Sequence, residues 1–321
     1  MMITGRKTVA VAVVLTVVAG IIMLMSQSFK EISESGETPS PAVAPALNII
    51  YKLPDSVTFA GERMPLENFD VRESLDREML TSAYRHSSTI LIIKRANRYF
   101  PVIEKILREN GLPDDMKYLV AAESEFMNVI SPAGATGMWQ IMQATGREAG
   151  MEINDVVDER YHLEKSTQLA CDYLKKSYLK YNNWTLAAAS YNGGRASIDR
   201  QIEIQKEQNY YDLLLNEETA RYIFRVVAYK LIISDPKKYG FDISKDDLYH
   251  ELDFREVTVD TAIADLQVFA VGMGTNYKML KYLNPWLRKP SFTPRPSKKY
   301  IIKIPSEGMR ISVPGETAAN V

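Results

Sequence analysis

A glutamate on the apolar face of a predicted helix is the first residue here that could do acid chemistry. The helix begins near Pro113, and in its sequence DDMKYLVAAESEF the apolar residues recur with helical spacing. Glu123 lies on that apolar stripe, whereas Glu125 falls on the opposite side. A carboxyl group in an apolar setting resists ionisation, so its pKa rises to where it can protonate a glycosidic oxygen near neutral pH. The alternative is a buried glutamate that only pairs with an arginine.

A segment rich in small residues, SPAGATGMWQIMQATG (131–146), follows this helix. Its glycines permit turns that a side chain would forbid, so the main chain can approach a ligand closely. Gln140 can both donate and accept hydrogen bonds, which suits the hydroxyl and acetamido groups of a sugar. Met138 and Trp139 are expected to fill the core instead.

Two later segments carry polar side chains at predicted helix ends. In NNWTLAAASYNGG (182–194), Tyr191 and Asn192 precede a glycine pair that ends the helix, where a phenol and an amide can bond a ligand. Packing and capping are equally good explanations for these two residues. In NEETARY (216–222), the pattern alone indicates acids in a first helical turn and a salt pair, formed by Glu217, Glu218 and Arg221.

A helical body must bring these segments together. The pattern predicts helices over 74–99, from Pro101, from Pro113, and over 164–181, 184–192, 195–208 and 217–234. Asn183 and Asn216 are expected as N-caps. After residue 250 the pattern changes to a strand at FREVTVD, two short helices, and a second strand at YIIKIP (300–305). The fold class is therefore mainly α, with a small separate βααβ module.

Composition excludes several classes of protein. The 321 residues carry 39 Lys+Arg and 40 Asp+Glu, so no basic field points to nucleic acid as the main partner. One cysteine excludes an internal disulfide framework, and three distant histidines are in no ligand spacing. We therefore expect no metal and no cofactor.

The N-terminus indicates an envelope location. Arg6 and Lys7 precede an uncharged run over 8–25 that would span roughly 27 Å as a helix, and mostly acidic charges follow it. This asymmetry places the rest of the chain outside the cytoplasm. A retained anchor and a cleaved signal peptide (1–26) both remain open. Residues 27–70 are expected to be a tether.

Taken in order, AESEF, SPAGATGMWQIM, ASYNGG and EETARY resemble the lytic murein transglycosylases of glycoside hydrolase family 23, closest to the membrane-bound D type. The resemblance spans roughly 70–240. It implies a lysozyme-like all-helical domain acting on peptidoglycan glycan strands. It also implies that Glu123 is the catalytic acid, supported by Ser124, and that the other substrate-binding residues are Ser131, Gln140, Met142, Tyr191, Asn192 and Glu218.

Two departures from the family's pattern affect the edge of the substrate-binding groove that the resemblance implies. The segment between Glu123 and Ser131 is about one residue shorter than in many relatives, and Glu125 stands where they often have a small residue. The C-terminal module resembles a divergent LysM glycan-binding domain, with Val259-Asp260-Thr261 in place of Gly-Asp-Thr and with a matching Asn284-Pro285 pair.

The resemblance implies cleavage of the bond between N-acetylmuramic acid and N-acetylglucosamine with formation of 1,6-anhydro ends. Two alternatives remain: a lysozyme that uses water, with Glu218 as its second carboxylate, and a non-catalytic peptidoglycan-binding protein. We expect a periplasmic monomer, held at the membrane by its N-terminal helix or secreted. The expected divisions are 1–26, 27–70, 71–245 for the catalytic domain, 250–305 for the LysM-like module, and a disordered tail over 306–321.

Overall fold

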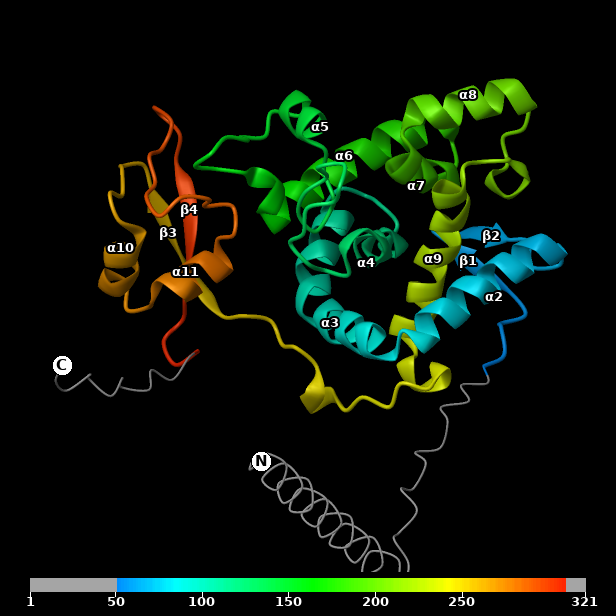
Figure 1. Cartoon of the computed structure of the whole chain (residues 1–321), viewed down its shortest axis with the longest axis horizontal. Coiled ribbons are helices and arrows are strands. Elements are labelled where there is room, and N and C mark those ends of the chain that lie inside the picture. The colour runs from blue at the N-terminus through cyan, green and yellow to red at the C-terminus, as the bar shows by residue number, and fades with distance from the viewer. Residues whose placement is uncertain (1–50, 310–321) are drawn as a thin grey trace, which may run out of the picture. The chain divides into compact units, whose positions relative to one another are not determined.

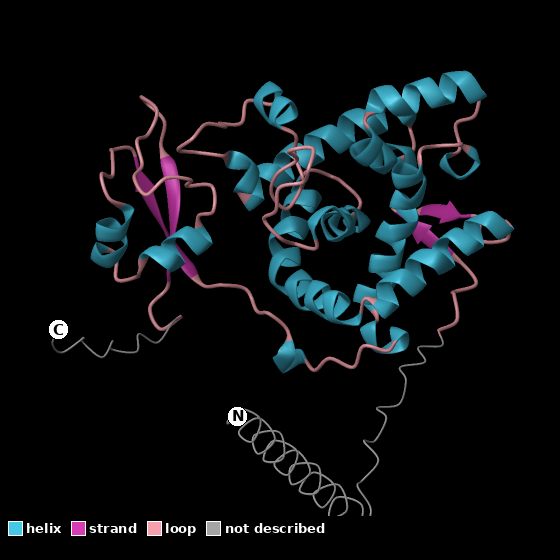
Figure 2. Ribbon diagram, in the orientation of Figure 1, coloured by secondary structure: helices cyan, strands magenta, loops and turns pink. Residues whose placement is uncertain are grey.

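The computed structural model describes residues 51–309, which are coloured in Figure 1. The predicted anchor or signal peptide lies outside this range, as does most of the predicted tail. Within 51–309, no helix combines the length and the apolar character needed to cross a membrane. The described chain is mainly helical and ends in a small module that contains strands (Figure 2).

The helical body holds the candidate residues. Its α-helices are α2 (Phe69–Tyr84), α3 (His86–Glu109), α4 (Tyr118–Ser124), α5 (Gln143–Glu148), α6 (Leu163–Tyr181), α7 (Trp184–Gly193), α8 (Arg195–Gln205) and α9 (Glu217–Ser234). Short 3-10 turns lie between these helices or follow α9: η1 (Asp114–Lys117), η2 (Glu159–Tyr161), η3 (Tyr210–Asp212), η4 (Pro236–Tyr239) and η5 (Lys245–Asp247). The short helix α4 buries nearly every side chain and packs against α9. It is therefore a central element, and Figure 1 shows it among the longer helices.

The first long helix was predicted over 74–99 with a new helix from Pro101, and this is wrong. The chain breaks at Arg85 instead, and α3 runs through Pro101. Pro101 is exposed, so water can bond the carbonyl group that the proline leaves free. Meanwhile α3 buries one continuous face, including Ile92, Ile103 and Leu107. Burial of that face outweighs the cost of the proline.

The tether predicted over 27–70 also extends too far along the chain. Within 27–70, strands β1 (Val57–Phe59) and β2 (Glu62–Met64) form an antiparallel hairpin, and Phe59 and Met64 are buried in the main core. The Glu62 carboxylate accepts hydrogen bonds from the backbone N–H groups of Trp184 (2.6 Å) and Thr185 (2.8 Å). The hairpin is therefore part of the helical body, because it caps the first turn of α7.

The predicted N-caps are confirmed. The side chain of Asn183 accepts from Leu186 N at the start of α7, and that of Asn216 accepts from Thr219 N at the start of α9. Helix α8, in contrast, ends three residues earlier than predicted, because Lys206 adopts a left-handed conformation.

The C-terminal module has the predicted βααβ order. Strands β3 (Phe254–Val259) and β4 (Tyr300–Pro305) pair antiparallel, and α10 (Leu266–Gly272) and α11 (Tyr277–Leu283) lie between them in sequence. Figure 2 shows the two strands in magenta. The buried Asn284 donates to Lys303 O (2.7 Å) and accepts from Lys303 N (2.8 Å). This amide therefore ties the end of α11 to β4.

Candidate active site

Glu123 lies in the last turn of α4. The helix was predicted to continue through Phe126, but it ends at Ser124 because Glu125 and Phe126 are both left-handed, with φ of 53° and 59°. Tyr222 on α9 donates a hydrogen bond from its hydroxyl to Glu123 Oε1 over 2.5 Å. A carboxyl group at the end of a buried helix is thereby held by a phenol from a second helix.

The electrostatic setting of Glu123 matches the expectation from the sequence. Burial raises its pKa to about 7, and the negative charge of Glu218 adds to the rise. The hydrogen bond from Tyr222 and the positive charge of Arg225 oppose it. Because the pKa lies close to neutrality, Glu123 can both give up and take back a proton there.

Tyr222 is a site residue that the sequence analysis missed. It is the last residue of EETARY, one helical turn after Glu218, and this i, i+4 spacing places the two residues on one face of α9. That spacing was the available signal. Burial raises the pKa of Tyr222 well above its usual value, and the neighbouring Glu123 raises it further. The phenol therefore remains a donor at neutral pH.

Tyr191 also lies near the acid. Burial raises its pKa far above the usual value, and the next largest cause is the charge of Glu123. Its hydroxyl donates to Trp139 O over 2.7 Å. Tyr191 therefore joins α7 to the main chain of the 131–142 segment, which we call the substrate loop.

Ser124 holds the same loop. Its side chain is buried, and its Oγ donates to Met138 O over 2.7 Å. Met138 and Trp139 are buried as expected, and the indole N–H of Trp139 donates to Thr167 Oγ1 over 2.8 Å. The main chain of the loop is thus fixed directly beside Glu123.

The polar side chains of the substrate loop mainly bond within the loop. Ser131 Oγ accepts from Ala135 N over 3.0 Å, and the Gln140 amide donates to Gly137 O over 2.7 Å. Gln140 also has a left-handed backbone, with φ of 48°. Met142, at the loop's end, is 44% exposed. These three residues are therefore connected to the surroundings of Glu123 through the main chain of the substrate loop.

The remaining two candidates lie at the junction of α7 and α9. Asn192 Oδ1 accepts from Thr219 Oγ1 over 3.0 Å. The Glu218 carboxylate accepts from Arg225 Nη1 over 3.0 Å, and its side chain is 60% exposed. Glu218 belongs to the group around Glu123 because its charge raises the pKa of that acid.

A charged hollow of about 330 Å³ opens beside Glu123. At its edge, the carboxylate of Glu78 is buried and accepts from Arg221 Nε over 2.7 Å, and Arg225 Nε lies 3.6 Å from it. Arg221 was predicted to pair with an acid on its own helix, and its Nη1 does lie 3.4 Å from Glu217. Its shorter contact, to Glu78 on α2, joins two helices.

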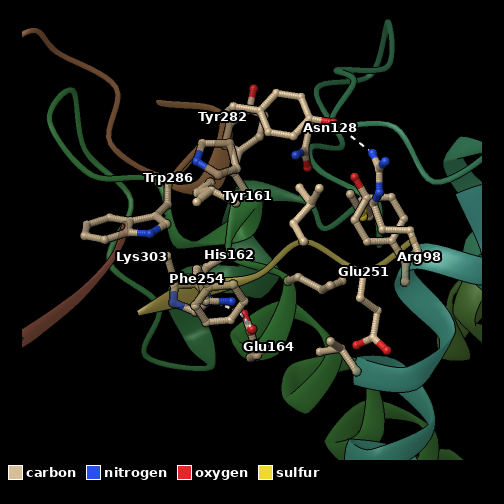
Figure 3. A pocket seen from close by; sticks show the side chains of 17 residues that line it. Arg98, Asn128, Tyr161, His162, Glu164, Glu251, Phe254, Tyr282, Trp286 and Lys303 are labelled. Carbon is tan, nitrogen blue, oxygen red and sulfur yellow. Dashed lines mark hydrogen bonds and ion pairs between the residues drawn. The ribbon is translucent and has the colours of Figure 1, made fainter. Parts of the chain in front are cut away.

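A second cavity, of about 120 Å³, lies between the helical body and the C-terminal module (Figure 3). His162 and Glu164 line it from the body, and Phe254, Trp286 and Lys303 line it from the module. Glu164 contacts both His162 and Lys303. Although burial alone would raise the pKa of Glu164, these two neighbours lower it to about 2. Glu123 is not among the lining residues, so this cavity is separate from the acid.

Among residues 51–309, no group of three or more His, Cys, Asp or Glu side chains could hold a metal ion. The single cysteine, Cys171, is buried and unpaired in α6.

Family comparisons agree with the site. Residues 100–214 match the family Transglycosylase SLT domain, which covers Glu123, the substrate loop and Tyr191. The chain contains a transglycosylase SLT domain. Residues 255–308 match the family Soluble lytic transglycosylase C-terminal LysM-like domain, so the C-terminal module is LysM-like. Tyr222 lies beyond the SLT match, although it bonds the acid within it.

The SLT-containing chain is similar to curated enzymes. It is 27% identical over 202 residues to membrane-bound lytic murein transglycosylase D of Escherichia coli strain K12, covering 60% of this chain and 44% of that protein. The same values hold for the protein of that name from E. coli O6:H1. The chain therefore spans less than half the length of the curated relatives it matches. The 70 kDa soluble lytic transglycosylase of E. coli is a structural match with 17% identity and a TM-score of 0.38, covering 56% of this chain and 32% of that one.

Proposed function

We propose that the protein is a peptidoglycan lytic transglycosylase with a lysozyme-like catalytic domain. The observation that supports this most directly is Glu123, a carboxyl group with a pKa of about 7 and a hydrogen bond from Tyr222, inside an SLT domain. Such a group is a general acid that changes easily to a base. Binding of peptidoglycan alone requires no proton donor, so this group favours the catalytic function over a non-catalytic one.

In the first step, Glu123 protonates the oxygen that links N-acetylmuramic acid to N-acetylglucosamine, and the glycosidic bond breaks. The resulting carboxylate keeps the hydrogen bond from Tyr222 and lies near the positive charge of Arg225. The N-acetyl group of the muramyl residue stabilises the positive charge at its anomeric carbon. The leaving sugar departs as a neutral alcohol, so charge balances across the step.

In the second step, the Glu123 carboxylate takes the proton from the 6-hydroxyl of the same muramyl residue. The oxygen closes on the anomeric carbon and forms the 1,6-anhydro ring. Glu123 is again protonated and ready for the next cycle. The exchange of acid and base roles on one carboxyl group follows from microscopic reversibility.

The residues around the acid are assigned to substrate binding by the same proposal. Ser124 acts indirectly, because its Oγ donates a hydrogen bond to Met138 O and so holds the substrate loop in place. The side chains assigned to the groove are Ser131, Gln140, Met142, Tyr191, Asn192 and Glu218. We further assign the enzyme to the periplasmic side of the cell envelope, held at the membrane or secreted through its N-terminal segment.

The mass of the products tests this function. Purified glycan strands incubated with the protein should give new ends about 18 Da lighter than hydrolysed ends, because the anhydro ring retains no water. These ends should resist borohydride, since they have no free reducing terminus. The matched control is Glu123→Gln, which should give no new ends.

The alternative outcomes each identify a different function. Reducible ends that carry oxygen from labelled water would show a hydrolytic lysozyme and contradict ring closure. Glu218 would then be the carboxylate to examine, although its pairing with Arg225 disfavours it as a free base for water. Binding of strands without any cleavage would show a non-catalytic protein.

A further inference from the structure

The segment from Glu152 to His162 packs into the hydrophobic core of the C-terminal module. It leaves the helical body, yet Val157 and Tyr161 are buried in the hydrophobic cluster of the C-terminal module. Backbone hydrogen bonds fix it there, from Asp158 N to Trp286 O (3.0 Å) and from Arg288 N to Val156 O (2.8 Å). We call 152–162 the bridging segment, since it pairs with the module as an added edge strand would.

Charged groups strengthen this attachment. The side chains of Glu152 and Glu159 are only 2% and 5% exposed, and Lys298 of the module lies 2.9 Å from each. The Tyr300 hydroxyl donates to Glu152 over 2.7 Å. Burial would raise the pKa of both carboxyl groups, but their partners lower it below the usual value. Glu159 also pairs with Lys165 of α6, but both cations beside Glu152, Lys298 and Arg295, come from the module. A buried carboxylate that loses its cations is costly, so the bridging segment depends on the module through Glu152.

On its other side, the bridging segment holds the substrate loop through Arg160. Its Nε and Nη2 donate to the two oxygens of Asp158 at 2.9 and 2.7 Å. Its Nη1 donates to the carbonyl oxygens of Gly134 (3.3 Å) and Ile141 (3.4 Å). The main chains also touch, because a Cβ on Gly137 would come within 2.2 Å of Arg160 O. One buried guanidinium thus joins the bridging segment to both ends of the loop.

The substrate loop in turn bonds to residues that lie beside Glu123. Met138 O accepts from Ser124, the residue after Glu123, and Trp139 O accepts from Tyr191, which lies close to Glu123. A continuous series of hydrogen bonds and packed main chain therefore runs from Lys298 and Tyr300 in the module to the surroundings of Glu123.

We propose that Arg160 is a positioning residue through which the C-terminal module sets the substrate loop against Glu123, so that the module contributes to bond cleavage and not only to retention on glycan. This inference rests on the proposed transglycosylase function. It differs from the usual view of a tethered binding module, because it makes cleavage of short soluble strands, which need no retention, depend on the module's contacts.

Arg160→Lys in the full chain tests the contact between the bridging segment and the substrate loop. Lysine keeps the charge but loses the planar fork that serves Asp158 and the loop together. We expect kcat on soluble glycan strands to fall by about tenfold to a hundredfold, since small misplacements at a site have effects of this size. The alkaline limb of the pH–rate profile should also move to lower pH, because a looser loop admits water to Glu123. Arg255→Lys, on β3 of the module, is the matched control and should behave as wild type.

Lys298→Ala tests the contact between the C-terminal module and the bridging segment. It also provides a second variant if Arg160→Lys fails to fold. It removes the cation shared by Glu152 and Glu159, whereas Lys299→Ala removes an exposed neighbouring lysine as its control. Lys298→Ala should lower kcat and shift the pH–rate profile in the same direction as Arg160→Lys, while Lys299→Ala should change neither.

Two results would overturn the inference while leaving the proposed function intact. One is wild-type kcat, KM and pH–rate profile in folded Arg160→Lys and Lys298→Ala proteins. The other is a lower melting temperature with an unshifted pH–rate profile, which would show a purely structural role. A wild-type protein that cleaves no strands would instead overturn the proposed function itself.

Discussion

Replacing Glu123 with glutamine should abolish cleavage and, at alkaline pH, stabilise the fold. Glutamine has nearly the same shape, and its Oε1 can still accept the hydrogen bond from Tyr222. It has no proton to give to the glycosidic oxygen. General acid or base catalysis contributes about a hundredfold to ten-thousandfold, and Glu123 serves in both roles, so we expect a loss of at least about a thousandfold, or roughly 4 kcal/mol in the barrier.

The effect on stability follows from the raised pKa of Glu123. Folding moves it from the reference value of 4.5 to about 7, so the folded state binds the proton more tightly than the unfolded state does. The free energy of unfolding therefore falls as the pH rises from 4.5 to 7. At about 1.4 kcal/mol per pKa unit, the full cost of ionising the buried group is at most about 3 kcal/mol. The Glu123→Gln variant does not lose this free energy above neutral pH, because glutamine does not ionise.

The assay is chemical denaturation of both proteins at several pH values, together with strand cleavage. The variant should exceed the wild type in stability by up to about 3 kcal/mol at pH 8, and the gain should vanish below about pH 4, where the wild-type carboxyl is protonated in both states. Glu125→Gln is the matched control; it breaks only the half-exposed pair with Arg85 and should cost at most about 1 kcal/mol. A Glu123→Gln protein that still cleaves strands, or whose stability difference does not vary with pH, would refute the reasoning.

Three further substitutions test other parts of the structure. Tyr222→Phe removes a hydrogen bond that lowers the pKa of Glu123, so the alkaline limb of the pH–rate profile should move to higher pH; an unmoved limb would contradict the contact. Gly137→Ala places a methyl group 2.2 Å from Arg160 O at φ of +82° and should lower the free energy of unfolding by about 2–5 kcal/mol, measured by denaturant titration. Glu62→Gln weakens the cap of α7 and should lower the same quantity by about 1 kcal/mol; no change would argue against the hairpin's role.

Local chemistry explains which parts of the fold could be predicted from the sequence. Asn183 and Asn216 were identifiable as N-caps because a cap depends on residues three positions away. Strands β3 and β4 were identifiable because β-branched residues cluster in them. The raised pKa of Glu123 followed from its place on an apolar stripe, which is also a local pattern.

The missed features depend on contacts between distant parts of the chain. Tyr222 and Glu123 are 99 positions apart, and only the packing of α9 on α4 brings them together. The early end of α4 is likewise imposed from outside, since Arg85 and Arg95 bond Glu125 across 40 and 30 positions. Arg160 lies in a segment with no distinctive periodicity, so its contacts with Gly134 and Ile141 left no trace in the local pattern.

The packing of α9 against α4, which carries Glu123, makes the proton donor sensitive to partial melting of the chain. Helix α9 packs against α2, α4 and α7, and it supplies part of the burial that keeps Glu123 protonated. If warming detached α9 alone, water would reach the carboxyl group and its pKa would return towards the ordinary value. At neutral pH the group would then be ionised and unable to donate. Proton donation, and with it the proposed activity, would be lost before most helices unfold, so the loss of activity on heating should precede the loss of the helical circular dichroism signal.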